Sequence, residues 1–501
     1  MDTKALRQKI LDLAIRGKLV PQDPNDEPAS VLLERIRAEK QQMVKDGKLK
    51  PKDIKNDTVI FKGDDNLHYE QYADGTVKCI EDEIPFDVPD NWEWCRLQTI
   101  CTKEIKRGKA PKYEEKSSVI VFAQKCNTKS GFIDISKAKF LAQNTLKKYA
   151  DEDFLYYNDI IINSTGTGTL GRVGIYKKED DIYSIKIVPD SHITTVRTIP
   201  SEINAQYIYY FLKFNQLYFE NSGVGSTNQK ELKPEVISTF LIAIPPLNEQ
   251  NAIIDKVNMI NKHLSNLDNE KEQLKELISS TKSKILDLAI RGKLVAQDPN
   301  DEPASILLER IRAEKEELIK QGRIKRNKKE SVIFKGDDNS YYEKYGEKLP
   351  SGWVVTNFET LLSYEQPTNY IVKDTNYNSE YETPVLTAGK SFILGYTNEK
   401  ENIFSELPVI IFDDFTTESK FVDFPFKVKS SAMKILHINT DLVLPKFAFY
   451  LMQATQIDHD NHQRYWISTY SQEEIALPPL KEQERILSAL KQYFKLLNCL
   501  L

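Results

Sequence analysis

The chain has 501 residues, of which 40% are hydrophobic and 29% charged, as in a globular protein of three or four compact units. No apolar run reaches the roughly 18 residues of a membrane span, and the charged first residues lack the apolar core of a signal peptide, so we expect a cytoplasmic protein. Five cysteines without a CxxC pair argue against disulfides or a zinc site, and the net charge of -5 argues against a uniformly basic surface.

A duplicated segment organises the chain. Residues 9–40 and 284–315 are identical at 30 of 32 positions, and both contain the stretch ILDLAIRGKLV. Weaker matches continue the repeat, namely VIFKGDDN at Val59 and Val332, then a proline and tryptophan three residues apart at Pro89 and Trp92 and again at Pro350 and Trp353. This duplication predicts two copies of one structural unit.

A helix is predicted after each of two PPL motifs. IPPLNEQNAII begins at Ile244, and LPPLKEQERIL begins at Leu477. Two prolines cannot lie inside a helix, whereas the Glu- and Gln-rich run after them suits a first turn. The helix after Leu247 meets no breaker until about Ile290, which gives about 43 residues, or roughly 64 Å.

The apolar residues of this long helix follow the alternating three and four spacing of a coiled coil: Ile253, Val257, Ile260, Leu264, Leu267, Leu274, Ile278, Ile285 and Leu288. The repeats match parts of this helix to both ends of the chain, so the same seam can be located there. It predicts inward-facing apolar residues at Leu6, Ile10, Leu13, Ile486, Leu490, Tyr493, Leu497 and Leu500. We therefore expect an antiparallel two-helix scaffold in which the two chain ends together supply the partner helix. This partner lacks only the part that is equivalent to about residues 269–275. A long helix that packs elsewhere in the core is the alternative.

Two segments of similar size lie between the helical pieces. Both contain short β-rich runs separated by polar loops in the same order, which predicts two mixed α/β domains. Residues 91–246 contain 21 Lys and Arg against 17 Asp and Glu, whereas residues 351–478 contain 9 against 17. The expected fold class is α/β (α+β), with two such domains on a coiled-coil scaffold in a pseudo-twofold circular arrangement. The expected segments are 1–90, 91–246, 247–350, 351–478 and 479–501.

A glycine-rich loop, NSTGTGTLGRVG, begins at Asn163 in the first domain. It lacks the lysine of a P-loop, and no long helix clearly follows it, which argues against nucleotide binding. A flexible turn is one interpretation. The other is a close approach to DNA, with Thr165, Thr167 and Arg172 near the backbone or a guanine, and with Lys125 as a further candidate contact.

A second candidate loop, GVGSTNQKEL, combines hydroxyls, amides and a cation in Ser226, Thr227, Asn228, Gln229 and Lys230. Asn and Gln can pair bidentately with adenine. The candidate contacts in the second domain are Lys390, Lys420, Lys427, Lys429, Arg464, Tyr465 and Trp466. The acidic excess there opposes DNA binding unless one face is locally basic, and aromatic residues of this kind are more often found in the core.

Catalytic patterns are missing from the sequence. IPPL and LPPL lack the polar residue of an adenine methyltransferase motif, and we find neither a Walker pair nor a nuclease-like carboxylate and lysine cluster. His459 and His462 lie three residues apart in a polar stretch, where histidines are usually solvated. We expect neither an enzyme active site nor a metal site.

The repeated LDLAIRGKLVPQDPNDEPASVLLERI and PPLxEQ stretches, together with two domains separated by long helices, closely resemble the specificity subunit of type I restriction-modification enzymes. The resemblance covers essentially the whole chain. It implies a non-catalytic subunit that reads a split double-stranded DNA target, one half per domain, with the coiled coil fixing the gap. By the same resemblance, Gly223–Lys230 is a recognition loop.

The resemblance also implies partners. Two modification subunits would dock on the scaffold and methylate adenine with S-adenosylmethionine, and restriction subunits would add ATP- and Mg-dependent translocation and cleavage, while this chain binds no cofactor. Two other functions remain as alternatives: a scaffold that binds only proteins, and an enzyme that uses the glycine loop. Salt-sensitive DNA binding would distinguish the first alternative, and nucleotide titration the second.

Overall fold

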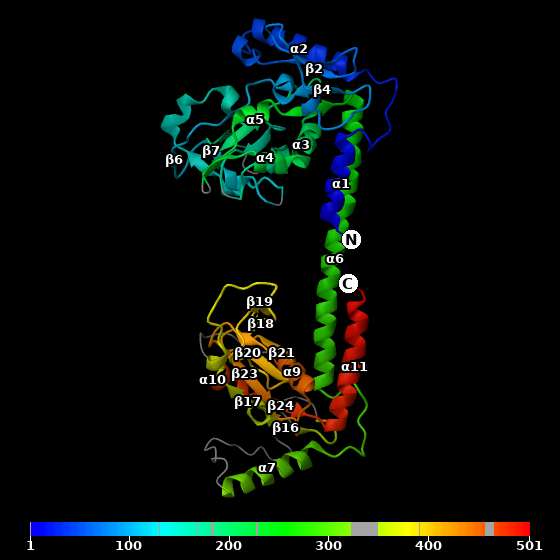
Figure 1. The fold of residues 1–501 in the computed structure, drawn as a ribbon, viewed down its shortest axis with the longest axis vertical. Helices are drawn as coiled ribbons and strands as arrows, with labels where there is room; N and C mark the ends of the chain where they lie inside the picture. Colours follow the sequence, from blue (N-terminus) through cyan, green and yellow to red (C-terminus); the bar gives the residue numbers. More distant parts are fainter. Residues whose placement is uncertain are drawn as a thin grey trace. The chain divides into compact units, whose positions relative to one another are not determined.

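The computed structural model describes residues 2–129, 131–166, 168–181, 185–226, 229–321, 349–389, 391–455 and 465–500. The chain forms two compact units, Met1–Asn269 and Glu270–Leu501, and helix α6 (Leu247–Ile290) contributes residues to both (Figure 1). Each unit combines mixed sheets and helices with an antiparallel helix pair, which confirms the predicted fold class. The five finer segment boundaries stay predictions. Among the described helices, none is long and apolar enough to cross a membrane.

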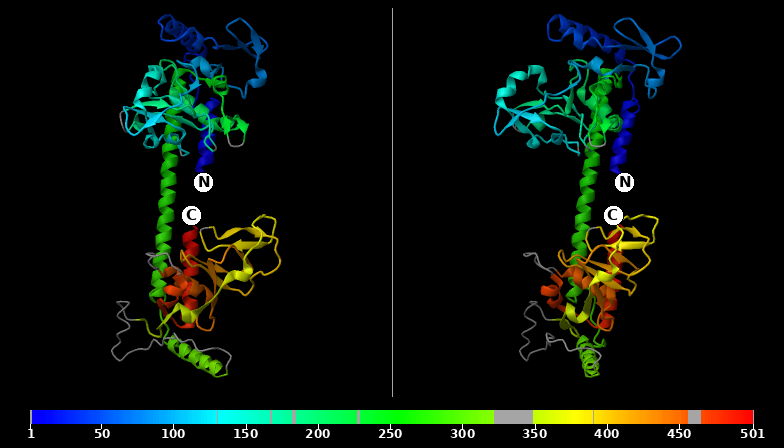
Figure 2. Two further views of the ribbon diagram at one scale, coloured as in Figure 1. Left: turned by 90° about the vertical axis from the view of Figure 1, so that its left-hand side faces the viewer. Right: turned by 60° about the vertical axis from the view of Figure 1, so that its left-hand side comes forward.

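The N-terminal helix packs antiparallel on the first part of α6. Helix α1 (Thr3–Ile15) begins after Asp2, whose carboxylate accepts hydrogen bonds at 3.0 Å from two backbone N–H groups of the first turn. Thr3 Oγ1 donates to Asp268 Oδ1 at 2.7 Å, and Arg7 Nη2 donates to Asp268 Oδ2 at 3.0 Å. Both views of Figure 2 show α1 alongside α6. The antiparallel pairing predicted for the N-terminal helix is therefore present within this unit.

The apolar seam of the first unit is buried over most of this contact. Its buried members are Ile10, Ile253, Val257 and Leu264, and its half-buried members are Leu13 and Ile260. Leu6 and Leu267 are 37% and 39% exposed, because they lie where the overlap of the two helices ends.

The C-terminal helix α11 (Leu480–Asn498) packs antiparallel on the last part of α6. Lys282 Nζ donates to Asn498 Oδ1 at 2.6 Å. The core of this contact contains Ile285, Ile486 and Leu490, while Ile278 is buried, Leu274 and Leu497 are half-buried, and Tyr493 and Leu500 are exposed. The predictions for Leu288 and Tyr493 are wrong: they are 37% and 46% exposed, and their neighbours Ala289 and Phe494 pack inward instead. A straight helix drifts by about 20° per heptad, so the inward position moves by one residue over this length.

Both units contain the same junction between the repeated helix, a tryptophan-bearing segment and the PPL helix. In the first unit, Trp92 Nε1 donates to Glu249 Oε2 at 2.9 Å. In the second unit, Trp353 Nε1 donates to Glu482 Oε2 at 3.0 Å. Both glutamates are buried, and burial raises the pKa of Glu249 and of Glu482. The repeated proline, tryptophan and PPLxEQ motifs therefore build one junction twice.

A glycine turn closes each junction. Gly17 and Gly292 have φ values of +64° and +65°, and a Cβ atom on either would lie about 2.5 Å or less from the ring of a proline, Pro89 or Pro350. Only glycine combines a left-handed backbone with this close approach. This explains why the two copies of ILDLAIRGKLV share their glycine.

We expect Trp92→Phe and Trp353→Phe each to destabilise only the unit that contains it. Each change removes the hydrogen bond to a buried carboxylate, which should cost about 1.5–3 kcal/mol. Hydrogen-exchange mass spectrometry of the full chain in urea would measure the two units separately. Trp94→Phe is the matched control, since Trp94 is equally buried but its Nε1 has no hydrogen-bond partner among the described residues. Equal losses in both units from a single change would contradict the prediction.

A small arm joins the first junction to the first domain. It contains helix α2 (Ala29–Lys45) and an antiparallel sheet of β1 (Val59–Lys62), β2 (His68–Gln71) and β3 (Val77–Cys79). Lys40 lies in the C-terminal half of α2 and is 1% exposed. Its Nζ pairs with Asp57 Oδ2 at 2.5 Å and donates to two backbone carbonyls. Both members of this ion pair belong to the arm, and Lys40 ties the arm to the first domain through the carbonyls of Gln98 and Thr99.

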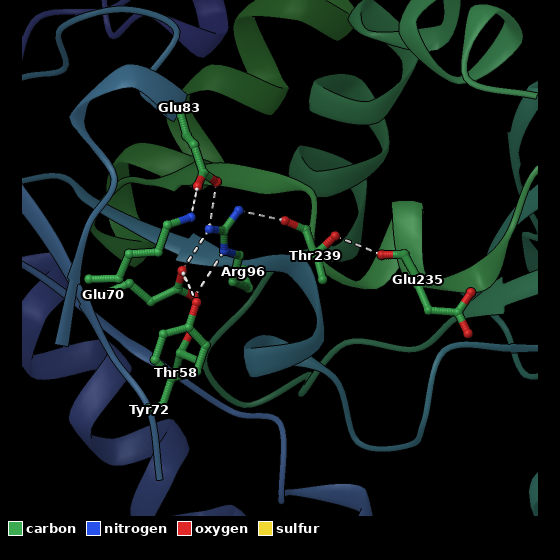
Figure 3. A network of polar contacts seen from close by, with 8 residues as sticks. Thr58, Glu70, Tyr72, Glu83, Arg96, Glu235 and Thr239 are labelled. Atoms are coloured by element: carbon green, nitrogen blue, oxygen red, sulfur yellow. Dashed lines mark hydrogen bonds and ion pairs between the residues drawn. The ribbon is translucent and has the colours of Figure 1, made fainter. Parts of the chain in front are cut away.

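Arg96 provides the second attachment of the arm (Figure 3). Its guanidinium donates to both carboxylate oxygens of Glu70, at 3.0 and 2.6 Å, to Glu83 at 2.8 Å and to the carbonyl of Thr239 at 2.9 Å. Glu70 also accepts from Thr58 at 2.6 Å. Since Glu70 is 2% exposed, its charge depends on Arg96, and burial of the pair fixes the small sheet against the domain.

The first domain, predicted over residues 91–246, contains two four-stranded sheets. The sheet β10–β9–β12–β5 is antiparallel, and the sheet β11–β7–β8–β6 includes the parallel pair β7 and β11. Strands β4 and β15 pair separately at the scaffold. The elements are β4 (Glu93–Arg96), β5 (Lys106–Arg107), β6 (Tyr113–Glu114), β7 (Val119–Phe122), β8 (Lys139–Leu141), β9 (Ile160–Asn163), β10 (Val173–Ile175), β11 (Lys186–Pro189), β12 (Ile193–Val196), α3 (Ala205–Phe214), α4 (Gln216–Asn221), β13 (Val224–Ser226), β14 (Gln229–Glu231), α5 (Pro234–Ser238) and β15 (Leu241–Ile244).

The second domain, predicted over residues 351–478, repeats most of this strand order, without a counterpart of β6 among the described residues. Its sheets are β17–β23–β20–β21, the β19–β18–β22 sheet with a parallel β18 and β22 pair, and the scaffold pair β16 and β24. Two copies of one mixed α/β domain were predicted, and the matching strand orders confirm them. The elements of this unit are α7 (Ala304–Lys320), β16 (Val354–Asn357), α8 (Phe358–Leu361), β17 (Leu362–Glu365), β18 (Thr383–Leu386), β19 (Ile393–Thr397), β20 (Val409–Asp413), β21 (Ser419–Val422), β22 (Lys427–Val428), β23 (Met433–Ile438), α9 (Pro445–Ala454), α10 (Tyr465–Ser468) and β24 (Glu474–Leu477).

Candidate nucleic-acid interface

The two polar loops predicted from the sequence lie side by side in the first domain. Thr165, at the start of the glycine loop, forms a β-bridge with Glu231 at the end of the β13–β14 hairpin. Next to it, the N–H of Leu232 donates to the carbonyl of Ser164 at 2.8 Å. We call the surface around this bridge the loop face and define it by Lys125, Thr165, His192, Lys230 and Glu231.

Thr165 is held from two sides. Its Oγ1 accepts a hydrogen bond from Gln124 Nε2 and lies 2.7 Å from His192 Nδ1, and the residue is 9% exposed. The side chain was predicted to contact DNA directly, but its oxygen is already engaged, so it positions the loop instead. Gln124 and His192 were missed, because a single Gln and a single His far apart in the sequence carry no pattern.

Arg172, a residue of the glycine loop, donates hydrogen bonds to backbone carbonyls in and beside that loop. Its Nη1 donates to the carbonyl of Asn127 at 2.6 Å, and its Nη2 donates to the carbonyl of Gly168 at 3.1 Å. Two of the five guanidinium N–H donors are used on backbone carbonyls that fix the shape of the loop, and the contact of Arg172 with phosphate or guanine stays a prediction.

Exposed cations border the loop face. Lys125 follows Gln124 directly, and Lys230 lies on β14; both are exposed. Arg107, which was not among the candidate contacts, extends from β5 to the hairpin, where Nη2 donates to the carbonyl of Leu232 at 3.0 Å and pairs with Glu231 at 3.3 Å. A basic run, KEIKRGK, was the available signal. Ser226 and Gln229 are described only as strand residues, and Thr167, Thr227 and Asn228 lie outside the described residues.

The second domain uses its lysines differently. Lys427 is 2% exposed, pairs with Glu399 Oε2 at 3.1 Å and donates to the carbonyl of Glu401 at 2.9 Å, so its prediction as a DNA contact is wrong. Lys420 is half-buried and pairs with Glu418 at 3.4 Å, whereas Lys429 is exposed. Lys390, Arg464, His459 and His462 lie outside the described residues.

Tyr465 and Trp466 belong to the core of the second domain. Each is 2% exposed, and the Trp466 ring packs against Phe412 and Tyr470, with ring centroids 5.4 and 6.0 Å apart. The backbone N–H of Trp466 donates to Asp414 Oδ1 at 3.0 Å. The prediction that they contact DNA is corrected, because aromatic packing removes both rings from solvent.

Comparison with known proteins shows which proteins this chain is similar to. The family model of the type I restriction modification DNA specificity domain matches residues 89–277. The specificity subunit of the Escherichia coli type I restriction enzyme EcoEI is 31% identical over 402 residues, which are 70% of this chain and 60% of that relative. Residues 89–277 thus match a type I restriction-modification DNA specificity domain, and the chain is similar in sequence to specificity subunits of type I restriction enzymes.

Two further proteins match the chain over a shorter stretch or at lower sequence identity. The Escherichia coli EcoR124I/EcoR124II specificity subunit is 43% identical over 164 residues, 32% of this chain and 40% of that relative. The chain thus spans less than two thirds of the length of either curated relative. A solved chain from a study of complex assembly and conformational transition of the type I R-M system aligns with a TM-score of 0.49 and 14% identity, covering 83% of this chain and 93% of that chain.

Proposed function

We propose that this chain recognises double-stranded DNA for a type I restriction-modification system, with the loop face of the first domain reading one half of a split target. The supporting observation is the bridge between Thr165 and Glu231, which joins two polar loops that the sequence separates. Exposed Lys125 and Lys230 border them. Polar loops read base edges, and lysines neutralise phosphates, so the face has both components of DNA recognition.

The second domain reads the other half of the target in this proposal. Its matching topology presents a corresponding edge, while its different loops give it a different sequence preference. Good bidentate contacts discriminate by about 1–3 kcal/mol each, so two domains at a fixed separation multiply specificity.

The chain directs catalysis by its partners and performs none itself in this proposal. Two identical junctions, at Glu249 and at Glu482, favour docking of two copies of one protein, the modification subunit. That subunit would methylate adenine with S-adenosylmethionine, and restriction subunits would add ATP and Mg chemistry in the cytoplasm.

Replacement of residues 91–246 by the corresponding segment of a specificity subunit with another target should change one half of the methylated motif and leave the other half and the gap unchanged. The chain would be co-expressed with its modification subunit in a host without adenine methylation, and methylated adenines would be mapped across the genome. Absence of any split motif, with an active and complexed modification subunit, would favour a scaffold that binds only proteins. A change in both halves would contradict independent reading by two domains.

A further inference from the structure

The base of the glycine loop is bridged by one buried side chain. Asn127 directly follows the 3₁₀ turn η4 (Gln124–Cys126) and is 0% exposed. Its Nδ2 donates to Asn163 Oδ1 at 3.1 Å and to the backbone carbonyl of Arg172 at 3.0 Å. Asn163 ends β9, and Arg172 directly precedes β10. The amide therefore joins the two strands between which the loop runs, and the structure describes residues 163–166 and 168–174 of that loop.

The glycine loop holds Asn127 in return. Arg172 Nη1 donates to the carbonyl of Asn127 at 2.6 Å, so the side chain of each residue bonds the backbone carbonyl of the other. The contact is close, because a Cβ atom on Gly174 would lie 2.8 Å from Asn127 Oδ1. That Oδ1 has no hydrogen-bond partner among the described residues, which costs free energy in a buried place. Asn127 thus carries an unpaired acceptor, while its Nδ2 supplies the donors for both ends of the loop.

A second anchor comes from the same turn. Lys125, an exposed cation of the loop face, lies between the two anchors in the chain. Gln124 Nε2 donates to Thr165 Oγ1, and the carbonyl of Gln124 accepts from Asn163 Nδ2 at 3.4 Å. Gln124 and Asn127 together therefore hold the loop near its beginning and near its end. A loop that is already ordered loses less conformational entropy when it binds, which strengthens binding.

We propose that Asn127 and Gln124 are positioning residues for DNA recognition by the first domain. They fix the glycine loop in the shape that contacts base edges, and Asn127 acts only through the loop because it is buried. This role rests on the proposed DNA recognition and extends it to residues outside both polar loops. Base contacts depend on the shape of the loop, whereas phosphate contacts of exposed lysines carry no sequence information. Loss of either anchor should therefore weaken binding to the target more than binding to other DNA.

Asn127→Ala tests the buried anchor. We expect roughly tenfold weaker binding to the target duplex and at most about twofold weaker binding to a scrambled duplex, because the released loop must order on binding while the exposed lysines remain. Fluorescence anisotropy of the full chain in complex with its modification subunit would measure both affinities. Mapping of methylated adenines should find added sites that deviate from the motif in one half only.

Gln98→Ala is the matched control. Gln98 is also a buried amide of the first domain, with Nε2 donating to the carbonyl of Lys103 at 3.0 Å and Oε1 accepting from the N–H of Ile105 at 2.9 Å. Its amide thus makes two hydrogen bonds, as that of Asn127 does, but to residues outside both polar loops. The change should lower the melting temperature and leave the ratio of the two affinities unaltered. If Asn127→Ala shifts that ratio no more than Gln98→Ala does, Asn127 is only structural and the proposal is overturned.

Gln124→Ala keeps the test decisive if Asn127→Ala does not fold. Gln124 is half-buried, so water can replace its lost hydrogen bond. We expect the affinity ratio to change in the same direction. The double variant should lose less target affinity than the product of the two single losses, because both anchors hold one loop. An unchanged ratio in Gln124→Ala, or losses that simply multiply in the double variant, would contradict the positioning of one loop by two residues.

The two proposals fail in different ways. A wild-type complex that methylates a split motif, together with unchanged affinity ratios in Asn127→Ala and Gln124→Ala, would overturn the positioning role alone. A wild-type complex that methylates no split motif, with an active modification subunit bound, would overturn DNA recognition by this chain and the positioning role with it.

Discussion

Thr165→Val is expected to reduce affinity for the target DNA about ten- to a hundredfold and to blur the half-motif read by the first domain. The change removes the hydroxyl that accepts from Gln124 Nε2 and contacts His192 Nδ1, and it releases the glycine loop from its anchor. Gln124 is half-buried and His192 is exposed, so water can satisfy both, and the expected loss of affinity comes from the loop, which must then order on binding. Fluorescence anisotropy with target and scrambled duplexes, together with genome-wide methylation mapping, would measure both effects.

Thr145→Val is the control for this prediction. Thr145 is also a buried threonine of the first domain, with its hydroxyl donating to the carbonyl of Ala142 at 2.7 Å, away from the loop face. It should cost stability without altering the motif. If Thr165→Val lowers binding no more than Thr145→Val does, the two polar loops do not act together in recognition.

Lys40→Met should destabilise the attachment of the arm to the first domain by about 3–5 kcal/mol at neutral pH, the cost of leaving one partner of a buried ion pair alone. Asp57 would keep a buried carboxylate without its ammonium, and the carbonyls of Gln98 and Thr99 would lose their donor. Urea titration followed by hydrogen exchange over residues 29–45 and 93–101 would report the loss in the full chain.

The pKa of Asp57 determines whether the stability loss of Lys40→Met grows or shrinks as pH rises. Burial raises the pKa of Asp57 to about 6, despite the nearby Lys40. Because this folded-state pKa lies above the unfolded value, the folded state binds the proton more tightly, and the stability gained from protonation is lost as pH rises through about 6. The Lys40→Met loss should therefore be smaller at pH 5 than at pH 8. The double variant Lys40→Met with Asp57→Asn should recover much of the stability, and a loss independent of pH would contradict this account.

The two domains share a topology but distribute charge differently. In the second domain, Lys434 pairs with Asp414 at 3.2 Å and Lys427 pairs with Glu399, and both lysines are at least 98% buried. These cations pair with carboxylates of their own domain and are withdrawn from solvent. The acidic excess seen in the sequence is thus accompanied by removal of basic side chains from the surface, which is why the sequence count alone could not locate a basic face.

The scaffold was largely predictable because its signals are local or repeated. Seam residues such as Val257 and Leu490 recur at helical spacing, and periodicity reports which side of a helix is buried without knowledge of its partner. The prediction failed at Leu288, where small angular drift accumulates over many turns until a neighbour takes the inward place. Repetition also identified Trp92 and Trp353, but not that each donates to a glutamate far along the chain.

The sequence by itself determined that this protein has two copies of one architecture and which family it resembles. It also determined where the long helix begins and ends. Duplication and periodicity are properties of the residue order alone, so they need no knowledge of the tertiary structure. The tertiary structure alone decided which polar residues are available. Lys427, Tyr465 and Trp466 were candidates in the sequence on the same footing as the exposed lysines, yet each is buried by side chains brought from distant segments. Burial and hydrogen-bond satisfaction depend on such long-range neighbours, which composition and spacing do not encode.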